Sequence, residues 1–157
     1  MADELPEIRP AHSAEEYRAA LQVRIAVFVA EQGGPLSDEP DAWDAAARQF
    51  VVICGGKVVG TARIYHPDPG ITKLGRICLL REWRSRGWGA LLMQALLLHA
   101  RGLGTNRIVL DAQTYALPFY ERFGFVPVGE EFVDGGILHR RMELASSHLP
   151  DLPQRHL

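Results

Sequence analysis

The stretch RSRGWGA, residues 84–90, constrains the fold more than any other part of this 157-residue chain. Two glycines, Gly87 and Gly89, stand one residue apart among arginines, and a run of mostly apolar residues follows them. A glycine within a helix costs about 1 kcal/mol relative to alanine, so a pair at a helix start indicates that side chains would obstruct something there. Because a helix N-terminus also attracts phosphate groups, the stretch predicts an anion-binding strand-to-helix loop, here called the glycine loop (residues 84–90). The same glycines could instead serve only a tight turn.

Two common nucleotide-binding motifs are excluded at this loop. No lysine followed by serine or threonine closes it, as a Walker A loop requires. Leu92 stands where a Rossmann fingerprint would have its third glycine.

The apolar pattern around the loop predicts an α/β fold, a mixed sheet with helices on both faces. Ser13 and Glu16 form a capping-box pattern that begins a helix over residues 14–32, and Gly55-Gly56 indicates a hairpin turn within 49–66. Further strands are expected at 4–11, 71–80, 106–112, 125–129 and 137–144, and further helices at 36–49, after the glycine loop and at 114–124. We expect one domain over residues 1–144 and a C-terminal tail over 145–157.

Composition narrows the classes of partner. A net charge of −2 and a pI near 6.3 provide no basic field, so we expect neither a nucleic acid nor a membrane partner. The longest apolar run, Ala90 to Leu98, is far shorter than the roughly 20 residues that span a bilayer, which favours a soluble, cytoplasmic protein. Cys54 and Cys78 lack metal-ligand spacing, so both are interpreted as buried thiols and no metal is expected.

A second stretch, AQTYALPFYERFGF at 112–125, changes the interpretation of the first. Together the two resemble the central motifs of the GCN5-related N-acetyltransferase (GNAT) family, Arg/Gln-x-x-Gly-x-Gly/Ala and Phe-Tyr-x-x-x-Gly-Phe, in the same order and spacing. The resemblance covers residues 5 to 144. It implies the GNAT fold, with a twisted, mostly antiparallel sheet and a splayed central β-α-β unit.

Three further segments resemble the ElaA-like branch of that family: VRIAVFVAEQ at 23–32, LGRICLL at 74–80 and GGILHRRMEL at 135–144. Two residues depart from the usual pattern. Arg81 and Leu138 stand where proline is frequent, and the second departure weakens the inference about the neighbouring His139.

The resemblance implies that acetyl-CoA is the co-substrate. Its pyrophosphate would lie on the loop amides of Arg84, Ser85, Arg86, Gly87, Trp88, Gly89 and Ala90. Its pantetheine arm would lie along Ile77, Cys78 and Leu79, with the Leu79 N–H polarising the thioester carbonyl. Gln113 falls where the family frequently has an asparagine that contacts this arm, although a polar residue that merely ends a strand is an equal explanation.

Tyr120 is the expected acid, since a phenol can donate a hydrogen bond or a proton to the departing thiolate. The expected base is His139, which alternates away from the apolar set Leu138, Met142 and Leu144, although a surface histidine would fit the same pattern. Glu31 is another candidate base, with an ordinary solvated carboxylate as its alternative.

Other residues have open roles. Arg63 and Arg76 could bind an acidic acceptor or form buried pairs with Asp111 or Glu143. Cys78 is a poor candidate for an acyl carrier, because an apolar strand raises a thiol's pKa. Trp43 and Trp83 offer contact area without readable chemistry.

The sequence therefore predicts an N-acetyltransferase that moves an acetyl group from acetyl-CoA to a primary amine by direct attack in a ternary complex. The acceptor would be a small molecule or a peptide, and a homodimer is possible. The alternatives are a non-catalytic module that binds or senses acyl-CoA, and a protein that binds another phosphorylated ligand on the same loop.

Overall fold

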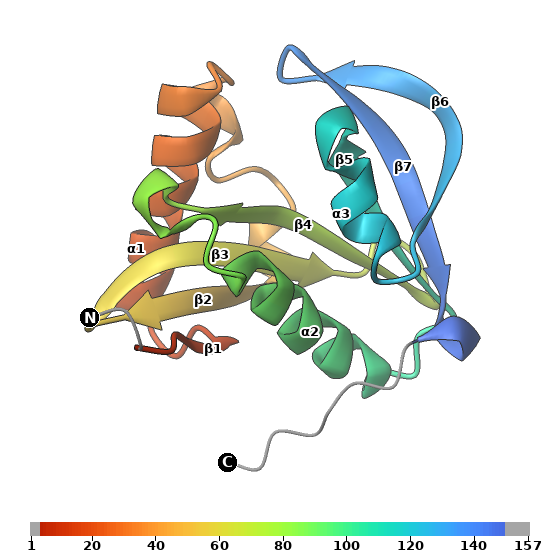
Figure 1. The fold of residues 1–157 in the computed structure, drawn as a ribbon, viewed down its shortest axis with the longest axis horizontal. Coiled ribbons are helices and arrows are strands. Elements are labelled where there is room, and N and C mark those ends of the chain that lie inside the picture. Colours follow the sequence, from red (N-terminus) through yellow and green to blue (C-terminus); the bar gives the residue numbers. More distant parts are fainter. Residues whose placement is uncertain (1–3, 150–157) are drawn as a thin grey trace.

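A seven-stranded sheet organises residues 4–149, the part of the chain that the computed structural model describes. The strand order is β1-β2-β3-β4-β5-β7-β6, and neighbouring strands are antiparallel except β4 and β5, which are parallel. The strands are β1 Glu7–Pro10, β2 Arg48–Cys54, β3 Lys57–Tyr65, β4 Ile71–Leu79, β5 Arg107–Gln113, β6 Val126–Asp134 and β7 Ile137–Ala145 (Figure 1). The mixed, mostly antiparallel sheet predicted from the sequence is confirmed.

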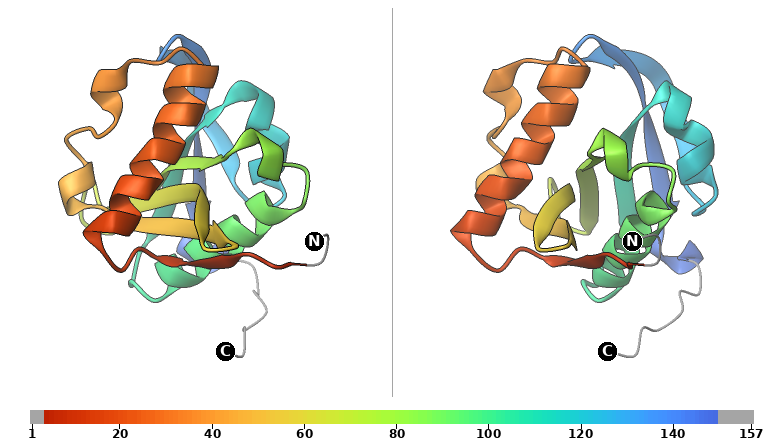
Figure 2. Two further views of the ribbon diagram at one scale, coloured as in Figure 1. Left: turned by 90° about the vertical axis from the view of Figure 1, so that its left-hand side faces the viewer. Right: turned by 60° about the vertical axis from the view of Figure 1, so that its left-hand side comes forward.

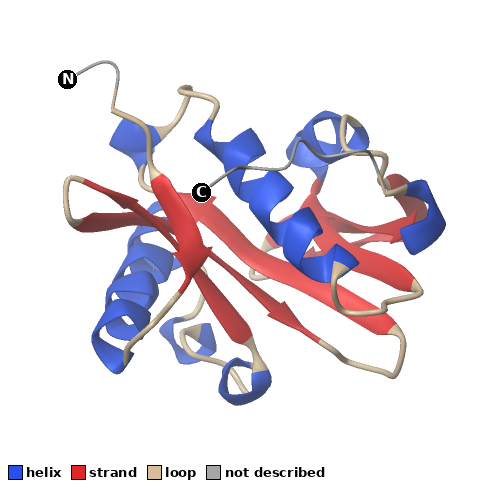
Figure 3. Ribbon diagram, turned by 90° about the horizontal axis from the view of Figure 1, so that it is seen from below, coloured by secondary structure: helices blue, strands red, loops and turns tan. Residues whose placement is uncertain are grey.

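Helices cover both faces of this sheet (Figures 2 and 3). The α-helices are α1 Ala14–Arg24, α2 Trp88–Arg101 and α3 Leu117–Glu121, and α1 continues as a π-helix over Ile25–Glu31. Short 3-10 turns occupy Leu36–Asp38, Asp44–Ala46, Arg81–Trp83, Thr114–Ala116 and Ser146–His148. No helix among residues 4–149 is both long enough and apolar enough to cross a membrane.

The helices bury their apolar sides in two separate clusters. The larger cluster lies between α2 and the sheet, and its buried strand residues come from β2, β3, β4, β5 and β7. Leu92, Met93 and Leu96 of α2 are fully buried in it. On the other face, Val23 and Val27 of the first helix pack against Cys78 in a smaller cluster. The first helix begins as predicted, because the Ser13 Oγ accepts a hydrogen bond from the Glu16 N–H at 3.1 Å.

Three predicted elements differ in the structure. Residues 36–47 contain two 3-10 turns rather than one helix, because Pro40 cannot donate a backbone hydrogen bond and the carboxylates around it are bound by arginines. Arg48 and Gln49, the end of the expected helix, already belong to β2. The strand expected at 125–129 extends to Asp134, where its hairpin with β7 turns. The helix expected at 114–124 is a 3-10 turn followed by five helical residues. Residues 150–157 of the expected tail lie outside the described residues, whereas Leu149 packs against the core.

The parallel pair β4 and β5 separates halfway along its length. Only Ile71 to Leu74 pair with β5, from Arg107 to Leu110. Beyond this point β4 carries a bulge opposite β3, and Arg76 there has a left-handed backbone with φ 49°. After the bulge β4 follows β3 while β5 follows β7, so a gap opens between them. This gap places unpaired strand backbone beside the glycine loop.

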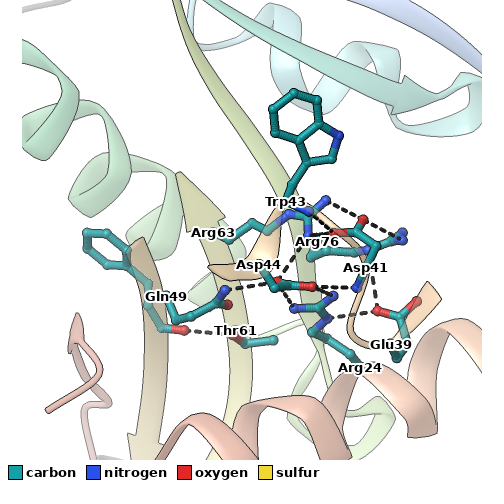
Figure 4. Close-up of polar contacts among 10 residues, drawn as sticks. Arg24, Glu39, Asp41, Trp43, Asp44, Gln49, Thr61, Arg63 and Arg76 are labelled. Carbon is teal, nitrogen blue, oxygen red and sulfur yellow. Dashed lines mark hydrogen bonds and ion pairs between the residues drawn. The ribbon is translucent and has the colours of Figure 1, made fainter. Parts of the chain in front are cut away.

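A charged network occupies the space between α1 and the sheet where apolar packing would be expected (Figure 4). Arg24 is fully buried and donates to both oxygens of Asp44, at 2.7 and 2.9 Å, and to Glu39 at 2.8 Å. Gln49 donates a further hydrogen bond to Asp44 at 2.9 Å. Although burial alone would raise the pKa of the Asp44 carboxyl, its hydrogen bonds with Arg24 hold that pKa well below its usual value. The network therefore requires all its partners to be charged.

Arg24→Met is expected to lower the free energy of unfolding by about 3–5 kcal/mol, because it leaves two buried carboxylates without their main partner. Urea denaturation at pH 7 measures this loss. The difference from the parent should narrow below about pH 4, since the parent loses the contribution of its depressed Asp44 pKa as pH falls, whereas an Asp44 that has lost Arg24 and keeps Arg63 protonates more readily.

Arg18→Met is the matched control, because Arg18 lies exposed on the same helix and should change the free energy of unfolding by less than about 0.5 kcal/mol. A loss below about 1 kcal/mol for Arg24→Met would show that the network is dispensable for folding.

Candidate active site

A cavity of about 650 Å³ follows the gap between β4 and β5. Residues of β3, β4, β5 and β7 line it. The end of the first helix, the segment 36–47, the glycine loop, α2 and α3 with the turn before it contribute further walls, and β6 contributes its last residue. The sequence-predicted residues that line it are Ile77, Cys78, Leu79, Arg84, Gly89, Gln113, Tyr120 and His139. The structure therefore brings together both predicted motifs and the final strand.

The glycine loop turns sharply into α2. Ser85 and Gly87 both have positive φ values, 65° and 79°, and Gly87 is the residue at which the helix begins. No side chain caps the helix, so its first N–H groups, from Trp88, Gly89 and Ala90, lack an intrahelical partner. A side chain at Gly89 would meet only the Phe119 ring, at 3.5 Å from the added Cβ. The loop thus has the open backbone that an anion requires.

The arginines of the loop are already engaged. Arg84 forms a bidentate ion pair with the Glu31 carboxylate, at 2.8 and 3.0 Å, and its Nε donates to the Leu79 carbonyl at 2.9 Å. Arg86 lies over the rings of Trp83 and Trp88, at 4.8 and 5.7 Å from their centroids. The side chains of Arg84 and Arg86 therefore stabilise the loop itself, and the backbone amides remain available to a ligand.

Glu31 is a corrected expectation, because it is neither a free carboxylate nor placed to act as a base. The hydrogen bonds from Arg84 lower the pKa of its carboxyl, and Arg81 lies 3.3 Å away. A carboxylate that is paired in this way is a weak proton acceptor. It ties the end of the first helix to the loop.

The end of β4 presents backbone groups to the gap. The Leu80 N–H donates to the Val59 carbonyl on β3 at 2.9 Å. Since N–H groups of an extended strand alternate in direction, the N–H of Leu79 points to the opposite side, into the gap. Gly60 on β3 leaves room for this end of β4, because a Cβ there would overlap the Leu79 side chain and lie 3.0 Å from the Cys78 carbonyl oxygen.

Cys78 has the chemistry of a buried core residue. Burial raises the pKa of its thiol to about 12, and its side chain belongs to the cluster with Val23 and Val27. A thiol with this pKa is almost entirely protonated at neutral pH, so it is a poor nucleophile. Its role as an acyl carrier is disfavoured on physical grounds.

Tyr120 extends from α3 into the cavity between two aromatic rings, with centroids 5.1 Å from Phe119 and 6.4 Å from Phe125. Its hydroxyl has no hydrogen-bond partner within residues 4–149. Burial raises the pKa of this phenol above its usual value. The group is therefore protonated at neutral pH and has a free O–H to donate.

His139 lies opposite Gln113 on the paired strands β7 and β5. Its Nδ1 lies 2.7 Å from the Ile137 carbonyl oxygen, which can only accept, so Nδ1 carries the proton. The lone pair of the neutral ring is then on Nε2. Leu138, which the sequence groups with the core, is exposed because it lies near the β6–β7 turn.

Gln113 reaches across the cavity rather than standing free. Its Nε2 donates to the side-chain oxygen of Gln32, at 2.9 Å, and Gln32 follows the π-helical turn of the first helix. The amide pair joins two walls of the cavity. Gln113 therefore keeps only part of its hydrogen-bonding capacity for a ligand.

Arg63 and Arg76 pair with different carboxylates from those named in the sequence analysis. Arg63 donates to both oxygens of Asp41, at 2.6 and 2.8 Å. Arg76 lies 3.3 Å from Glu39 and 3.7 Å from Asp41. The expected partner Asp111 is bound by Lys73 and Arg141, at 2.9 and 2.6 Å, and Glu143 pairs with Arg107, because these residues lie on the adjacent strands β4, β5 and β7.

Sequence analysis did not assign five aromatic residues to the cavity that they line: Phe28, Trp43, Tyr65, Tyr115 and Phe119. Trp43 stacks on Tyr65 with centroids 4.8 Å apart, and both line the cavity beside Arg63 and Lys73. Tyr65 ends β3 among hydrophobic residues, so nothing in its local pattern distinguishes it from core. Trp43 carried one usable signal, because it lies between Asp41 and Asp44, shortly after the Pro40 that interrupts the helix expected at 36–49.

Comparisons with known proteins agree with this geometry. The acetyltransferase (GNAT) domain matches residues 11–146 of the chain. The uncharacterized N-acetyltransferase YjcF of Bacillus subtilis is 41% identical over 133 residues, which cover 84% of this chain and 94% of YjcF. The chain therefore belongs to the GNAT acetyltransferase family.

Solved structures extend the similarity. An acyl-CoA N-acyltransferase from Pseudomonas aeruginosa superposes with a TM-score of 0.81 and 29% identity, covering 89% of this chain and 99% of that one. Escherichia coli ElaA gives a TM-score of 0.80 and 30% identity, covering 88% of this chain and 99% of ElaA. The GNAT fold and the likeness to ElaA predicted from the sequence are confirmed.

Proposed function

We propose that this protein is an acetyl-CoA-dependent N-acetyltransferase that acts on a primary amine by direct attack. The observation that carries the proposal is the separation of β4 from β5 directly beside the glycine loop. It leaves unpaired backbone on a strand and unpaired amides at a helix start, next to a free phenol and an imidazole in one cavity. An extended amide arm that ends in a pyrophosphate fits this set of groups.

Three parts of acetyl-CoA have a proposed contact: the pyrophosphate, the pantetheine arm and the thioester carbonyl. Its pyrophosphate lies on the amides of Gly87 to Ala90, and its pantetheine arm pairs with β4 at Ile77 to Leu79. Support comes from the Leu79 N–H, which points into the gap, and from the lack of a side chain at Gly89. Acetyl-CoA, when bound, supplies the thioester carbonyl that the amine attacks. The Leu79 N–H is placed to donate to the oxygen of that carbonyl.

Tyr120 stabilises the departing thiolate by donating a hydrogen bond. Because the pKa of Tyr120 is raised above about 10 and that of a free thiol is about 8.5, complete proton transfer to sulfur is unfavourable. The phenol therefore acts as a hydrogen-bond donor whose contribution grows as charge develops on sulfur.

His139 accepts the proton that the attacking amine loses. Its Nδ1–H is held by the Ile137 carbonyl, which orients Nε2 as the acceptor. The C–N bond forms, the C–S bond breaks, and the proton passes from the amine nitrogen to Nε2. This assignment needs no covalent intermediate on the protein, in agreement with the protonated, buried thiol of Cys78.

Gly89→Glu is expected to abolish acetyl-CoA binding while the protein still folds, because it adds a negative charge where the pyrophosphate should lie. Calorimetric titration with acetyl-CoA measures the loss, and Gly89→Ala is the matched control that adds only a methyl group. If Gly89→Glu folds and binds acetyl-CoA as tightly as the parent, the phosphate site is elsewhere.

Tyr120→Phe is expected to slow turnover by about a hundredfold or more, with little change in the dissociation constant of acetyl-CoA. The ring and its packing remain, whereas the hydrogen bond to the thiolate is lost. Thiol release with an active amine measures turnover, and calorimetry measures affinity. Turnover within about threefold of the parent, with chemistry rate-limiting, would remove Tyr120 from the mechanism.

His139→Ala is expected to slow acetyl transfer and to change the shape of its pH profile, because the rate in the parent depends on an imidazole that accepts the amine proton and the rate in the variant does not. The rate of acetyl transfer between pH 6 and 9 measures the effect. A pH profile that keeps the shape of the parent's would assign His139 to the cavity wall alone.

A further inference from the structure

The segment 36–47 is held in place by an unusual concentration of charge. Three of its carboxylates, Glu39, Asp41 and Asp44, are bound by three arginines from other elements. Those arginines are Arg24 at the end of α1, Arg63 on β3 and Arg76 on β4 (Figure 4). Buried ion pairs add little net stability relative to apolar packing. The main consequence of these ion pairs is that they fix the position of the segment 36–47 relative to the sheet.

Trp43 is the residue that this arrangement positions. Its backbone N–H donates to the Asp41 side chain at 3.0 Å, and the Asp41 N–H donates to Asp44 at 2.8 Å, so the turn around it is fixed at both ends. The indole points away from the ions (Figure 4) and stacks on Tyr65 with an interplanar angle of 22°. Tyr65 is only 4% exposed, whereas Trp43 is 46% exposed and lines the cavity. An aromatic surface therefore faces the cavity.

The charges around the pair indicate what this surface accepts. Arg63 and Lys73 lie 5.1 and 5.8 Å from the centre of the Tyr65 ring, so two cations already engage the aromatic pair. The face of Tyr65 is therefore already occupied by cations, whereas the half-exposed indole of Trp43 offers a ring surface on which a further flat group can stack. Every arginine and lysine that lines the cavity is paired with a carboxylate within residues 4–149, so a charged acceptor group finds no free basic side chain.

We propose that Trp43 is a specificity-determining residue for primary amines that carry a flat, uncharged aromatic or heteroaromatic body. The ring of the acceptor lies on the indole while its amine reaches the thioester. This inference rests on the proposed acetyl transfer, and it adds the chemical class of the acceptor.

The test compares 2-phenylethylamine with propylamine and 1,5-diaminopentane in the acetyl transfer assay. In the parent, kcat/KM for 2-phenylethylamine should exceed that for either other amine by about tenfold or more. Trp43→Ala should raise KM for 2-phenylethylamine about tenfold with little change in kcat, and should leave KM for propylamine and the acetyl-CoA dissociation constant unchanged. Trp43→Phe should restore most of the loss.

Leu36→Ala is the matched control, because Leu36 is an exposed apolar residue of the same segment that does not line the cavity. It should change neither KM value, and thermal unfolding of Trp43→Ala should confirm an intact fold. Preference for 1,5-diaminopentane, or an equal change in KM for all amines, would overturn the proposal.

Binding measurements separate this proposal from the proposed function. If no amine is acetylated by the parent, acetyl transfer fails, and calorimetric titration of 2-phenylethylamine still tests Trp43. Binding about tenfold weaker in Trp43→Ala than in the parent supports the aromatic surface. Equal binding to both proteins, or none to the parent, would overturn it.

Discussion

The separation of β4 from β5 is the constraint on which the candidate site depends. Hydrogen bonds between the two strands end after Leu74 and Leu110, and the bulge at Arg76 directs the rest of β4 along β3. Strand backbone that lacks a partner is costly unless a ligand or solvent satisfies it. In this chain the exposed groups lie beside the glycine loop, so one extended ligand can satisfy both.

A charged network supports one side of this gap. Ion pairs between the first helix, β3, β4 and the segment 36–47 replace the apolar packing that covers the other face. Arg84 adds a second connection, since it joins Glu31 at the end of the first helix to the Leu79 carbonyl on β4. The walls of the cavity are thus fixed by directional contacts, which suits the proposed binding of two substrates in a defined orientation.

The sequence predicted the parts of the fold that local patterns specify. Gly55-Gly56, the Ser13 cap and the glycine loop are short-range signals, and each lies where it was expected. Tyr120 and His139 were found through a resemblance and an alternation, and the structure places both in one cavity. The partners of Arg63 and the role of Trp43 could not be predicted, because they depend on a segment without regular structure whose position is set by contacts distant in sequence.

Amide hydrogen exchange at single-residue resolution, with and without saturating acetyl-CoA, tests the central claim most directly. The account predicts that exchange slows at the Leu79 amide and at the amides of Gly87 to Ala90, while the exposed Val133 on β6 is unaffected. Unchanged exchange at Leu79 and throughout the loop, in a protein that binds acetyl-CoA by calorimetry, would contradict the account.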